Sequence, residues 1–530
     1  MNAELASTLT EWQFWMLELQ FLLVIITTLI EAPRVLPGRR AVLAAAALAI
    51  LAWGIASALP PRTTRIFYDE QIYQSVGRSL AETGRAELCN EGDVEYGRLR
   101  CMQGQYNKEP NAYPYLLSVA YRIGGVSDLA GPRLNNIVAG LAVLVTFALG
   151  VVLFRDVRVA AASGVMLALM PMQIVWANTA AVEPSAALLS AAAVLSAAHY
   201  ARTRTSTALA WAVAVTVFAM SFRPESILIV PIVLLVIALL APAEFRTRRF
   251  WLGAAVAAVL AVLPLAHVFA VRNLSWEAPQ ARMSWSYLAS NFPTNFWFYF
   301  VDERFPALFT FMALAACFTR VAVRERLLLM VYFLVFWGVF LFFFAGSYNY
   351  GTDVRYSLLS YVPLVVLAGA GFARAISVVK RRWLAQRSES FAFAAGFAVI
   401  AFYFLSFTPL IRATGEEAWA ARADVRYAKE FSRRLPPNSI VLTHIPSMFH
   451  VWGFSAAQLS LATTDPLHVT HDLFPHYAGG VYVHWNYWCN ASNHIQQRFC
   501  AEGLKTFPHE LVDSRQERDY TYALYRLKKP

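Results

Sequence analysis

Apolar residues along this chain are gathered into long blocks separated by short polar stretches. Each block runs for about 15 to 22 residues, close to the length that an α-helix needs to cross the hydrocarbon core of a bilayer. Backbone polar groups in lipid must bond within their own segment, so we expect the blocks to be helices. The pattern predicts about twelve membrane spans, over residues 12–30, 41–59, 135–154, 159–177, 185–200, 207–221, 225–241, 250–271, 305–319, 327–345, 356–373 and 391–411.

Composition agrees with this pattern. Hydrophobic residues make up 58% of the chain and charged residues only 15%, which is far from the average of soluble proteins. The first apolar block contains Glu18 and has no basic segment before it, so a cleavable signal peptide is not predicted. We expect an integral, multi-pass membrane protein.

The basic residues predict the orientation of the spans. Alternate short loops carry most of the arginines and lysines, whereas the intervening loops 178–184, 222–224 and 346–355 hold only Arg223 and Arg355. Because basic loops stay on the cytoplasmic side, both termini are expected on the opposite face. The net charge of +11 is then largely a matter of topology, and no nucleic-acid partner is predicted.

The chain divides into a membrane domain, residues 1–411, and a polar segment, residues 412–530. Two long outside loops interrupt the membrane domain, at 60–134 and 272–304. In the polar segment a helical pattern ends at a proline pair, and short alternating stretches indicate strands at 439–443, 481–485 and 521–526. The predicted fold is an all-α polytopic membrane domain with a small C-terminal α/β extracytoplasmic domain.

Four cysteines fall in two local pairs on the predicted outside. Cys89 and Cys101 lie in the first long loop, and Cys489 and Cys500 lie in the C-terminal segment. Disulfides form in oxidising compartments, so we expect two of them. Sequence does not fix connectivity, and four free thiols remain the alternative.

Asp69 and Glu70 open a segment with helical spacing shortly after the second apolar block. Acids in a first helical turn suit the helix dipole, which is the plain interpretation. Further ionisable groups fall at the outside ends of other blocks, however. Acids and cations that converge on one face suit phosphate-linked group transfer, in which a base takes a proton and cations stabilise the leaving phosphate. These groups are Lys108, Glu109, Glu183, Arg223, Glu225, Asp353 and Arg355.

The order of these motifs resembles the GT-C superfamily of membrane glycosyltransferases, especially its protein O-mannosyltransferase and lipid A aminoarabinose transferase branch. In that family an Asp-Glu pair opens a helix in the first outside loop, with a Tyr one turn later, as Asp69, Glu70 and Tyr73 do. The family's later motifs are matched by Lys108 in an aromatic stretch, Arg133-Leu134, Glu183-Pro184, and Arg355-Tyr356 with Pro363. Glu109 departs from the pattern, because it replaces the usual first proline after the lysine.

The resemblance implies a sugar transfer from a polyprenyl-phosphate donor, with inversion, on the outer face of a bacterial inner membrane. It implies that Asp69 is the general base and that Glu70 orients the acceptor or the base. Tyr73, Glu109 and Glu183 would line the acceptor and donor pocket, and Lys108 and Arg355 would hold the phosphate. The acceptor is a lipid, a polysaccharide or a protein, and membrane lipids surround the protein. No cofactor is required, and the use of a divalent cation stays open.

Two other functions remain as alternatives. A lipid-linked glycan flippase or transporter would carry ionisable residues at mid-membrane, whereas the charges here gather at loop ends. A membrane scaffold without catalysis would tolerate the loss of Asp69.

Histidines are concentrated after residue 412, and His468, His471 and Asp472 lie near His476. Imidazole and carboxylate groups are metal ligands, but the spacing matches no tight zinc signature. No metal site is predicted.

Overall fold

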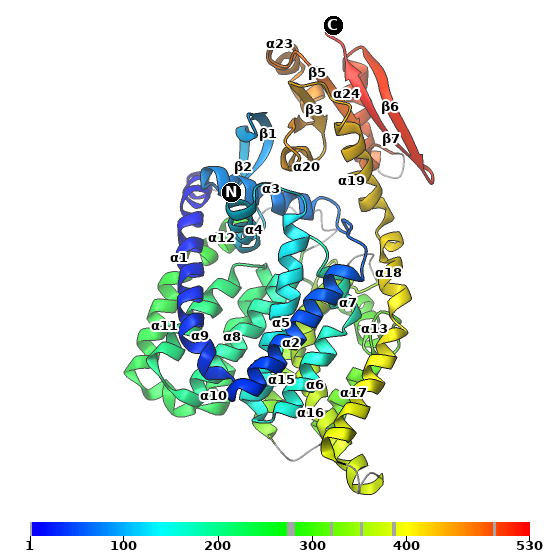
Figure 1. The fold of residues 1–530 in the computed structure, drawn as a ribbon. Coiled ribbons are helices and arrows are strands. Elements are labelled where there is room, and N and C mark those ends of the chain that lie inside the picture. The colour runs from blue at the N-terminus through cyan, green and yellow to red at the C-terminus, as the bar shows by residue number, and fades with distance from the viewer. Residues whose placement is uncertain (1–2, 273–280, 319–321, 350–352, 384–387, 491–493) are drawn as a thin grey trace.

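The computed structural model describes residues 3–272, 281–318, 322–349, 353–383, 388–490 and 494–530. Long helices form a body with a β-sheet at one end, and both ends of the chain lie toward that same end (Figure 1). The sheet-bearing end is joined to the body by the short helices α3 and α4 and by the long column of α17, α18 and α19 (Figure 1).

Six helical segments in the described residues are long and apolar enough to cross a membrane, and a helix pair bent by 44° makes up to seven. The chain is therefore a multi-pass membrane protein, as predicted. The six are α1 (Ala3–Val35), α2 (Gly38–Ala58), α5 (Ala130–Phe154), α15 (Val323–Val339) with η4 (Phe340–Phe342), η5 (Asp353–Ser357) with α16 (Leu358–Trp383), and α17 (Glu389–Leu405) with α18 (Thr408–Glu417). The bent pair is α11 (Arg248–Leu260) with α12 (Val262–Val271).

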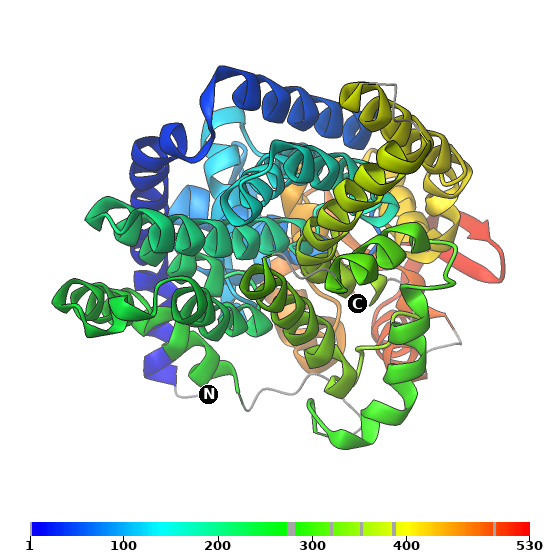
Figure 2. The ribbon, with the colours of Figure 1, turned by 90° about the horizontal axis from the view of Figure 1, so that it is seen from below.

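Shorter helices complete the body. They are α6 (Val157–Ala168), α7 (Pro171–Trp176), α8 (Glu183–Thr203), α9 (Ser206–Met220), η1 (Pro224–Leu228), α10 (Ile229–Leu240), η2 (Pro242–Arg246), η3 (Trp285–Tyr287), α13 (Leu288–Phe298) and α14 (Ala307–Cys317). Small side chains let these helices approach closely. A Cβ atom at Gly150 would lie 2.8 Å from the Cα of Ala160, for example. Helices α1, α2, α17 and α18 lie at the periphery and α5 inside (Figure 2), in accord with their burial.

The sheet has seven strands in the order β2-β1-β4-β3-β5-β7-β6. They are β1 (Glu87–Glu95), β2 (Arg98–Tyr106), β3 (Ser439–Thr443), β4 (Ser455–Gln458), β5 (Gly480–Trp485), β6 (His509–Glu517) and β7 (Tyr520–Leu527). Strand β3 runs parallel to β4 and β5, and the other pairings are antiparallel. Strands β3, β5 and β7 fall at the predicted positions. The β1–β2 hairpin was not predicted, and it brings the first long loop, residues 60–134, into the C-terminal sheet.

Helices cover the sheet and link it to the body. They are α3 (Asp69–Thr83), α4 (Ala112–Gly124), α19 (Trp419–Ser432), α20 (Pro446–Val451), α21 (Leu461–Thr464), α22 (Pro466–His468), η6 (Val469–Leu473), α23 (Phe474–His476), η7 (Tyr487–Cys489) and α24 (His494–Thr506). Helix α3 begins where the sequence predicts a helix, and it packs tightly against α4: a Cβ at Gly77 would meet the Cβ of Leu117 at 2.8 Å.

Both predicted cysteine pairs lie at disulfide distance. The sulfur atoms of Cys89 and Cys101 are 2.15 Å apart and cross-link the β1–β2 hairpin. Those of Cys489 and Cys500 are 2.08 Å apart and tie η7 to α24. Each disulfide thus closes a short loop in the part of the molecule that carries the sheet.

Candidate active site

Helix α3 presents two different faces to its surroundings. It begins at Asp69, directly after Tyr68, whose φ of 65° turns the chain sharply into the helix. With 3.6 residues per turn, Asp69 and Tyr73 lie on one face. Glu70, Gln71 and Gln74 lie about 100–200° further around the same helix. The two acidic neighbours therefore point to different sites.

The Asp69 carboxylate lies beside a fixed arginine. Its Oδ2 atom is 3.4 Å from Nη2 of Arg355, and 38% of the Asp69 side chain remains exposed. The surrounding protein withdraws the carboxylate from bulk water, which raises the pKa of Asp69 above its usual value, while Arg355 acts in the opposite direction. A carboxylate that is both accessible and raised in pKa is a suitable proton acceptor.

Glu183, the first residue of α8, binds two guanidinium groups. Its Oε1 atom is 2.5 Å from Nη1 of Arg223 and 3.0 Å from Nε of Arg355, and the residue is fully buried. Arg223 also pairs with Glu225 at the start of η1. Both guanidinium groups lie 5.0 Å from the ring centroid of Tyr356. Carboxylate and ring together fix the two arginines in place.

Lys108 and Glu109 enter the same cluster from the loop between β2 and α4. Burial, and then the Asp69 carboxylate, raise the pKa of Glu109 to about 7, while Arg223, Lys108 and Arg282 act to lower it. Burial also raises the pKa of Tyr73 well above its usual range, and Asp69 adds to that effect. Their mutual electrostatic influence means that these side chains share one site.

Arg282 was not predicted as a site residue. It precedes α13 in a stretch dense in aromatic residues, which are typical of segments anchored at a membrane surface. The guanidinium group lies 5.8 Å from the ring centroid of Phe343. Burial lowers the pKa of Arg282, while Glu109 and Glu225 act to raise it. A single cation in an aromatic stretch was the only available signal.

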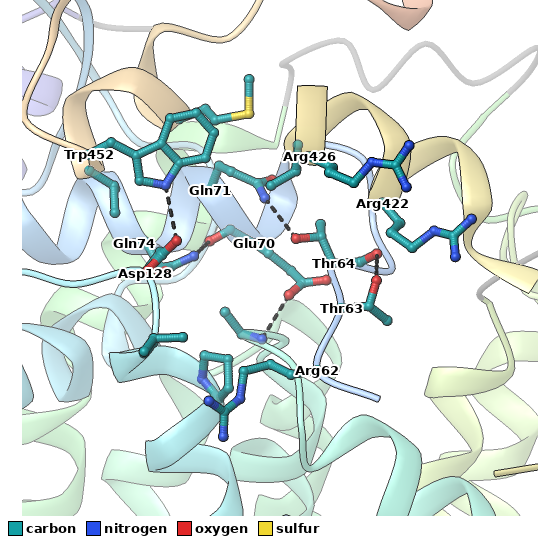
Figure 3. Close-up of a pocket in the computed structure, with 16 residues that line it drawn as sticks. Arg62, Thr63, Thr64, Glu70, Gln71, Gln74, Asp128, Arg422, Arg426 and Trp452 are labelled. Atoms are coloured by element: carbon teal, nitrogen blue, oxygen red, sulfur yellow. Dashed lines mark hydrogen bonds between the residues drawn. The ribbon is translucent and has the colours of Figure 1, made fainter. Parts of the chain in front are cut away.

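Glu70 has a different environment. Its Oε1 atom accepts hydrogen bonds from the backbone N–H groups of Arg65 (2.7 Å) and Ile66 (3.2 Å). Its Oε2 atom accepts from the N–H of Ala180 at 2.8 Å (Figure 3). The carboxylate thus joins the segment before α3 to the loop before α8, which positions Asp69 relative to Glu183.

An apolar cavity of about 320 Å³ lies between α13, α14, α15 and α16. Aromatic rings dominate its lining, which includes Phe292, Phe296, Tyr299, Phe300, Phe333 and Trp337. Just beyond Trp337 in the chain, Phe340 stacks on Tyr356 with ring centroids 4.5 Å apart. The chain segment that lines the cavity through Trp337 thus continues, three residues later, to the ring that stacks on Tyr356 of the charged cluster.

Two groups of side chains have a composition that suits a metal ion. His444 lies against Cys489 and Cys500, but those sulfur atoms are joined to each other. The ligand atoms of Asp93, Glu95 and His476 lie within 4.8 Å of one another. Asp93 and Glu95 belong to β1, and His476 belongs to α23.

No family model matches the sequence, and no curated protein sequence does either. Solved structures do match. ArnT from Cupriavidus metallidurans bound to undecaprenyl phosphate aligns with a TM-score of 0.56 at 15% identity, over 92% of this chain and 97% of that one. The Archaeoglobus fulgidus oligosaccharyltransferase in its apo form aligns with a TM-score of 0.51 at 14% identity, over 88% and 73%. The resemblance predicted from the sequence motifs is confirmed at the level of the fold: this chain has the fold of GT-C glycosyltransferases.

Proposed function

We propose that this protein is a membrane glycosyltransferase that moves a hexosyl or pentosyl group from a polyprenyl-phosphate donor to an acceptor hydroxyl. The observation that carries the proposal is the accessible Asp69 carboxylate beside arginines held by Glu183 and Tyr356. A base next to fixed cations is the arrangement that displacement of a sugar from phosphate needs.

The reaction follows from the chemistry of these groups. Asp69 takes the proton of the acceptor hydroxyl, and the acceptor oxygen forms a bond to C1 of the donor sugar. The bond between C1 and the phosphate oxygen breaks, and polyprenyl phosphate leaves with the electron pair. Attack opposite the leaving group inverts the configuration at C1. Lys108 and Arg355 stabilise the phosphate, because a guanidinium group binds two phosphate oxygens at once and an ammonium group acts as a point charge.

The other side chains support this chemistry. Glu183 holds the two arginines, and Glu70 is a positioning residue that fixes the start of α3 through three backbone amides. Tyr73 and Glu109 line the pocket. The aromatic cavity between α13 and α16 suits the hydrocarbon chain of the donor, because it offers an apolar surface at membrane depth.

The proposal extends to topology. It places about twelve spans in residues 1–411, some of them formed by the shorter apolar helices, and an extracytoplasmic domain in residues 412–530, whose sheet also includes the β1–β2 hairpin. Both termini and the site would lie on the outer face of a bacterial inner membrane. No metal is assigned a role, and the acceptor is a lipid, a glycan or a protein.

A transfer assay tests the proposal. Wild type, Asp69→Asn and the control Asp519→Asn, in the exposed turn before β7, are placed in phospholipid nanodiscs. They receive radiolabelled polyprenyl-phosphate sugars and a membrane extract as acceptor. Transfer by wild type and the control, but not by Asp69→Asn, is the expected result. If vesicles containing wild type move lipid-linked sugar across the bilayer and consume none, the protein is a transporter.

A further inference from the structure

A pocket of about 420 Å³ lies on the other face of α3, between the membrane body and the sheet-bearing part (Figure 3). Glu70, Gln71 and Gln74 line it from α3. The segments 62–64 and 128–132 line it from the body, and α19 and α20 line it from the C-terminal part. The proposed reaction does not use this pocket, although Asp69 immediately precedes its first α3 residue.

Two glutamine side chains give the pocket unused hydrogen-bonding capacity. Nε2 of Gln71 donates to Oγ1 of Thr64 at 3.3 Å, and Nε2 of Gln74 donates to the backbone oxygen of Glu70 at 3.2 Å. Each glutamine is only 5% exposed. Neither amide oxygen has a partner among the described residues. Buried polar atoms are nearly always bonded, so these two acceptors point to a ligand that carries donors.

Trp452 supplies a fixed aromatic surface. Its Nε1 atom donates to Oδ2 of Asp128 at 3.2 Å, and Lys429 pairs with the same carboxylate. The indole, half-buried, lines the pocket above the two glutamines (Figure 3). A held aromatic ring offers a flat apolar surface on which the ring face of another molecule can stack.

The pocket is lined by charges of both signs. Arg422 and Arg426 contribute their stems, and their guanidinium groups point away (Figure 3) toward Glu517, at 3.2 Å and 3.0 Å. Arg62 also lines the pocket, with its Nε atom 3.5 Å from Oδ1 of Asn178, and so do the carboxylates of Glu70 and Asp128. Oxygen acceptors, an aromatic surface and opposed charges together suit a ligand with many hydroxyl groups and no net charge.

We propose that this pocket binds a neutral saccharide unit of the acceptor. The inference rests on the proposed function, because it assumes that the protein has an acceptor. The pocket and the Asp69 cluster share the first turns of α3. An acceptor glycan held by Gln71, Gln74 and Trp452 therefore reaches the base around the N-terminal end of this helix.

Direct binding tests the pocket independently of transfer. The protein is placed in phospholipid nanodiscs, because glucoside and maltoside detergents carry the very groups under test. Saturation-transfer NMR measures maltose, lactose and N,N′-diacetylchitobiose, with glucose 1-phosphate as the anionic comparison. Three variants are compared with wild type. Gln71→Met with Gln74→Met removes both amides at nearly constant side-chain size, and Trp452→Leu removes the aromatic ring. Gln103→Met, on the exposed face of β2, is the control.

We expect at least one neutral disaccharide to bind wild type and the control. The double variant and Trp452→Leu should each weaken binding about tenfold, the usual order for losing hydrogen bonds or ring stacking to a ligand. Asp69→Asn should bind saccharide normally, because it lies on the other face of α3. In the transfer assay, the double variant should raise the acceptor KM with kcat nearly unchanged, a split that a merely structural defect would not give.

Several results would overturn the inference. One is that no disaccharide binds folded wild type even at roughly 50 mM, a concentration far above the Kd of a specific site. The second is preferred binding of glucose 1-phosphate, and the third is a loss of kcat with unchanged KM in the double variant. Saccharide binding without any transfer by wild type would instead overturn the proposed function and leave the pocket standing.

Discussion

Exchanging one acid of the pair Asp69-Glu70 at a time for its amide separates chemistry from structure. Asp69→Asn keeps the shape of the side chain and removes its ability to take a proton. Its only described ion pair, with Arg355, is at 3.4 Å, and the side chain is 38% exposed. Such a pair contributes at most about 1 kcal/mol to stability. We therefore expect Asp69→Asn to fold normally.

The two changes should affect different quantities. A positioned general base typically accelerates a reaction by about 10² to 10⁴, which corresponds to roughly 3 to 5 kcal/mol of barrier. Asp69→Asn should lower kcat by that amount. In wild type, Oε2 of Glu70 accepts a hydrogen bond from the N–H of Ala180 at 2.8 Å. Glu70→Gln instead places an NH₂ group, itself a donor, against that N–H group. One buried unsatisfied donor costs about 1–3 kcal/mol of stability.

The assay combines initial rates with thermal unfolding in the same nanodiscs. Asp69→Asn should lower kcat with an unchanged midpoint and an unchanged or lower donor KM, because a negative charge near the phosphate is gone. Glu70→Gln should lower the midpoint. Removing a general base should lower kcat by far more than about tenfold. If Asp69→Asn therefore retains more than about a tenth of wild-type kcat, the assignment of Asp69 as the base is wrong. A Glu70→Gln variant with wild-type stability and no activity would show that Glu70 takes part in the chemistry.

Four further predictions concern a buried carboxyl, a phosphate-binding arginine, metal removal and a disulfide. The pKa of Glu109 is raised to about 7, so this group makes wild type lose stability as the pH rises from about 4.5 through 7, and Glu109→Gln lacks that contribution. The difference between the two unfolding midpoints should therefore grow from pH 5 to pH 8, and a constant difference would contradict the shift. Arg355→Lys should raise donor KM about tenfold, because an ammonium group cannot replace a two-pronged contact with phosphate, whereas the control Arg412→Lys should leave it unchanged. EDTA should leave the transfer rate unchanged. The double change Cys89→Ser with Cys101→Ser, which removes one disulfide, should lower the free energy of unfolding by about 2–4 kcal/mol.

Elements with strong periodic signals could be predicted from the sequence. The long apolar helices and α3 follow from the length and spacing of hydrophobic residues. Strands β3 and β5 are short but continuous and buried, and β7 alternates. Strands β1 and β2 carry polar and charged side chains over most of their length. Strand β2 stays largely exposed at the edge of the sheet, and β1 is placed inside the sheet because Glu91 and Gly92 pair with Ala457 and Ala456 of β4. That contact joins distant segments, and no local pattern records it.

Loop-end charges were the useful signal for the site. Asp69, Glu183 and Arg355 meet because the outside ends of several spans lie at one level, which topology alone predicts. The distinct environments of Asp69 and Glu70 were harder to foresee, because adjacent residues on a helix point about 100° apart. Arg282 was overlooked for a related reason: its partners Glu109 and Glu225 lie in other loops, and an aromatic neighbourhood favoured anchoring.

The first outside loop explains how one short helix can serve two sites. After α3 the chain forms the β1–β2 hairpin, which joins the C-terminal sheet, and Arg78 of α3 donates to the backbone oxygen of His450 in α20. Before α3, Arg65 pairs with Glu417 at 2.7 Å, at the end of α18. Helix α3 is thus held from both sides by the C-terminal part of the chain. Because Glu70 also accepts a hydrogen bond from Ala180 of the membrane body, α3 holds Asp69 and the proposed saccharide pocket in one arrangement, which would keep an acceptor aligned with the proposed base.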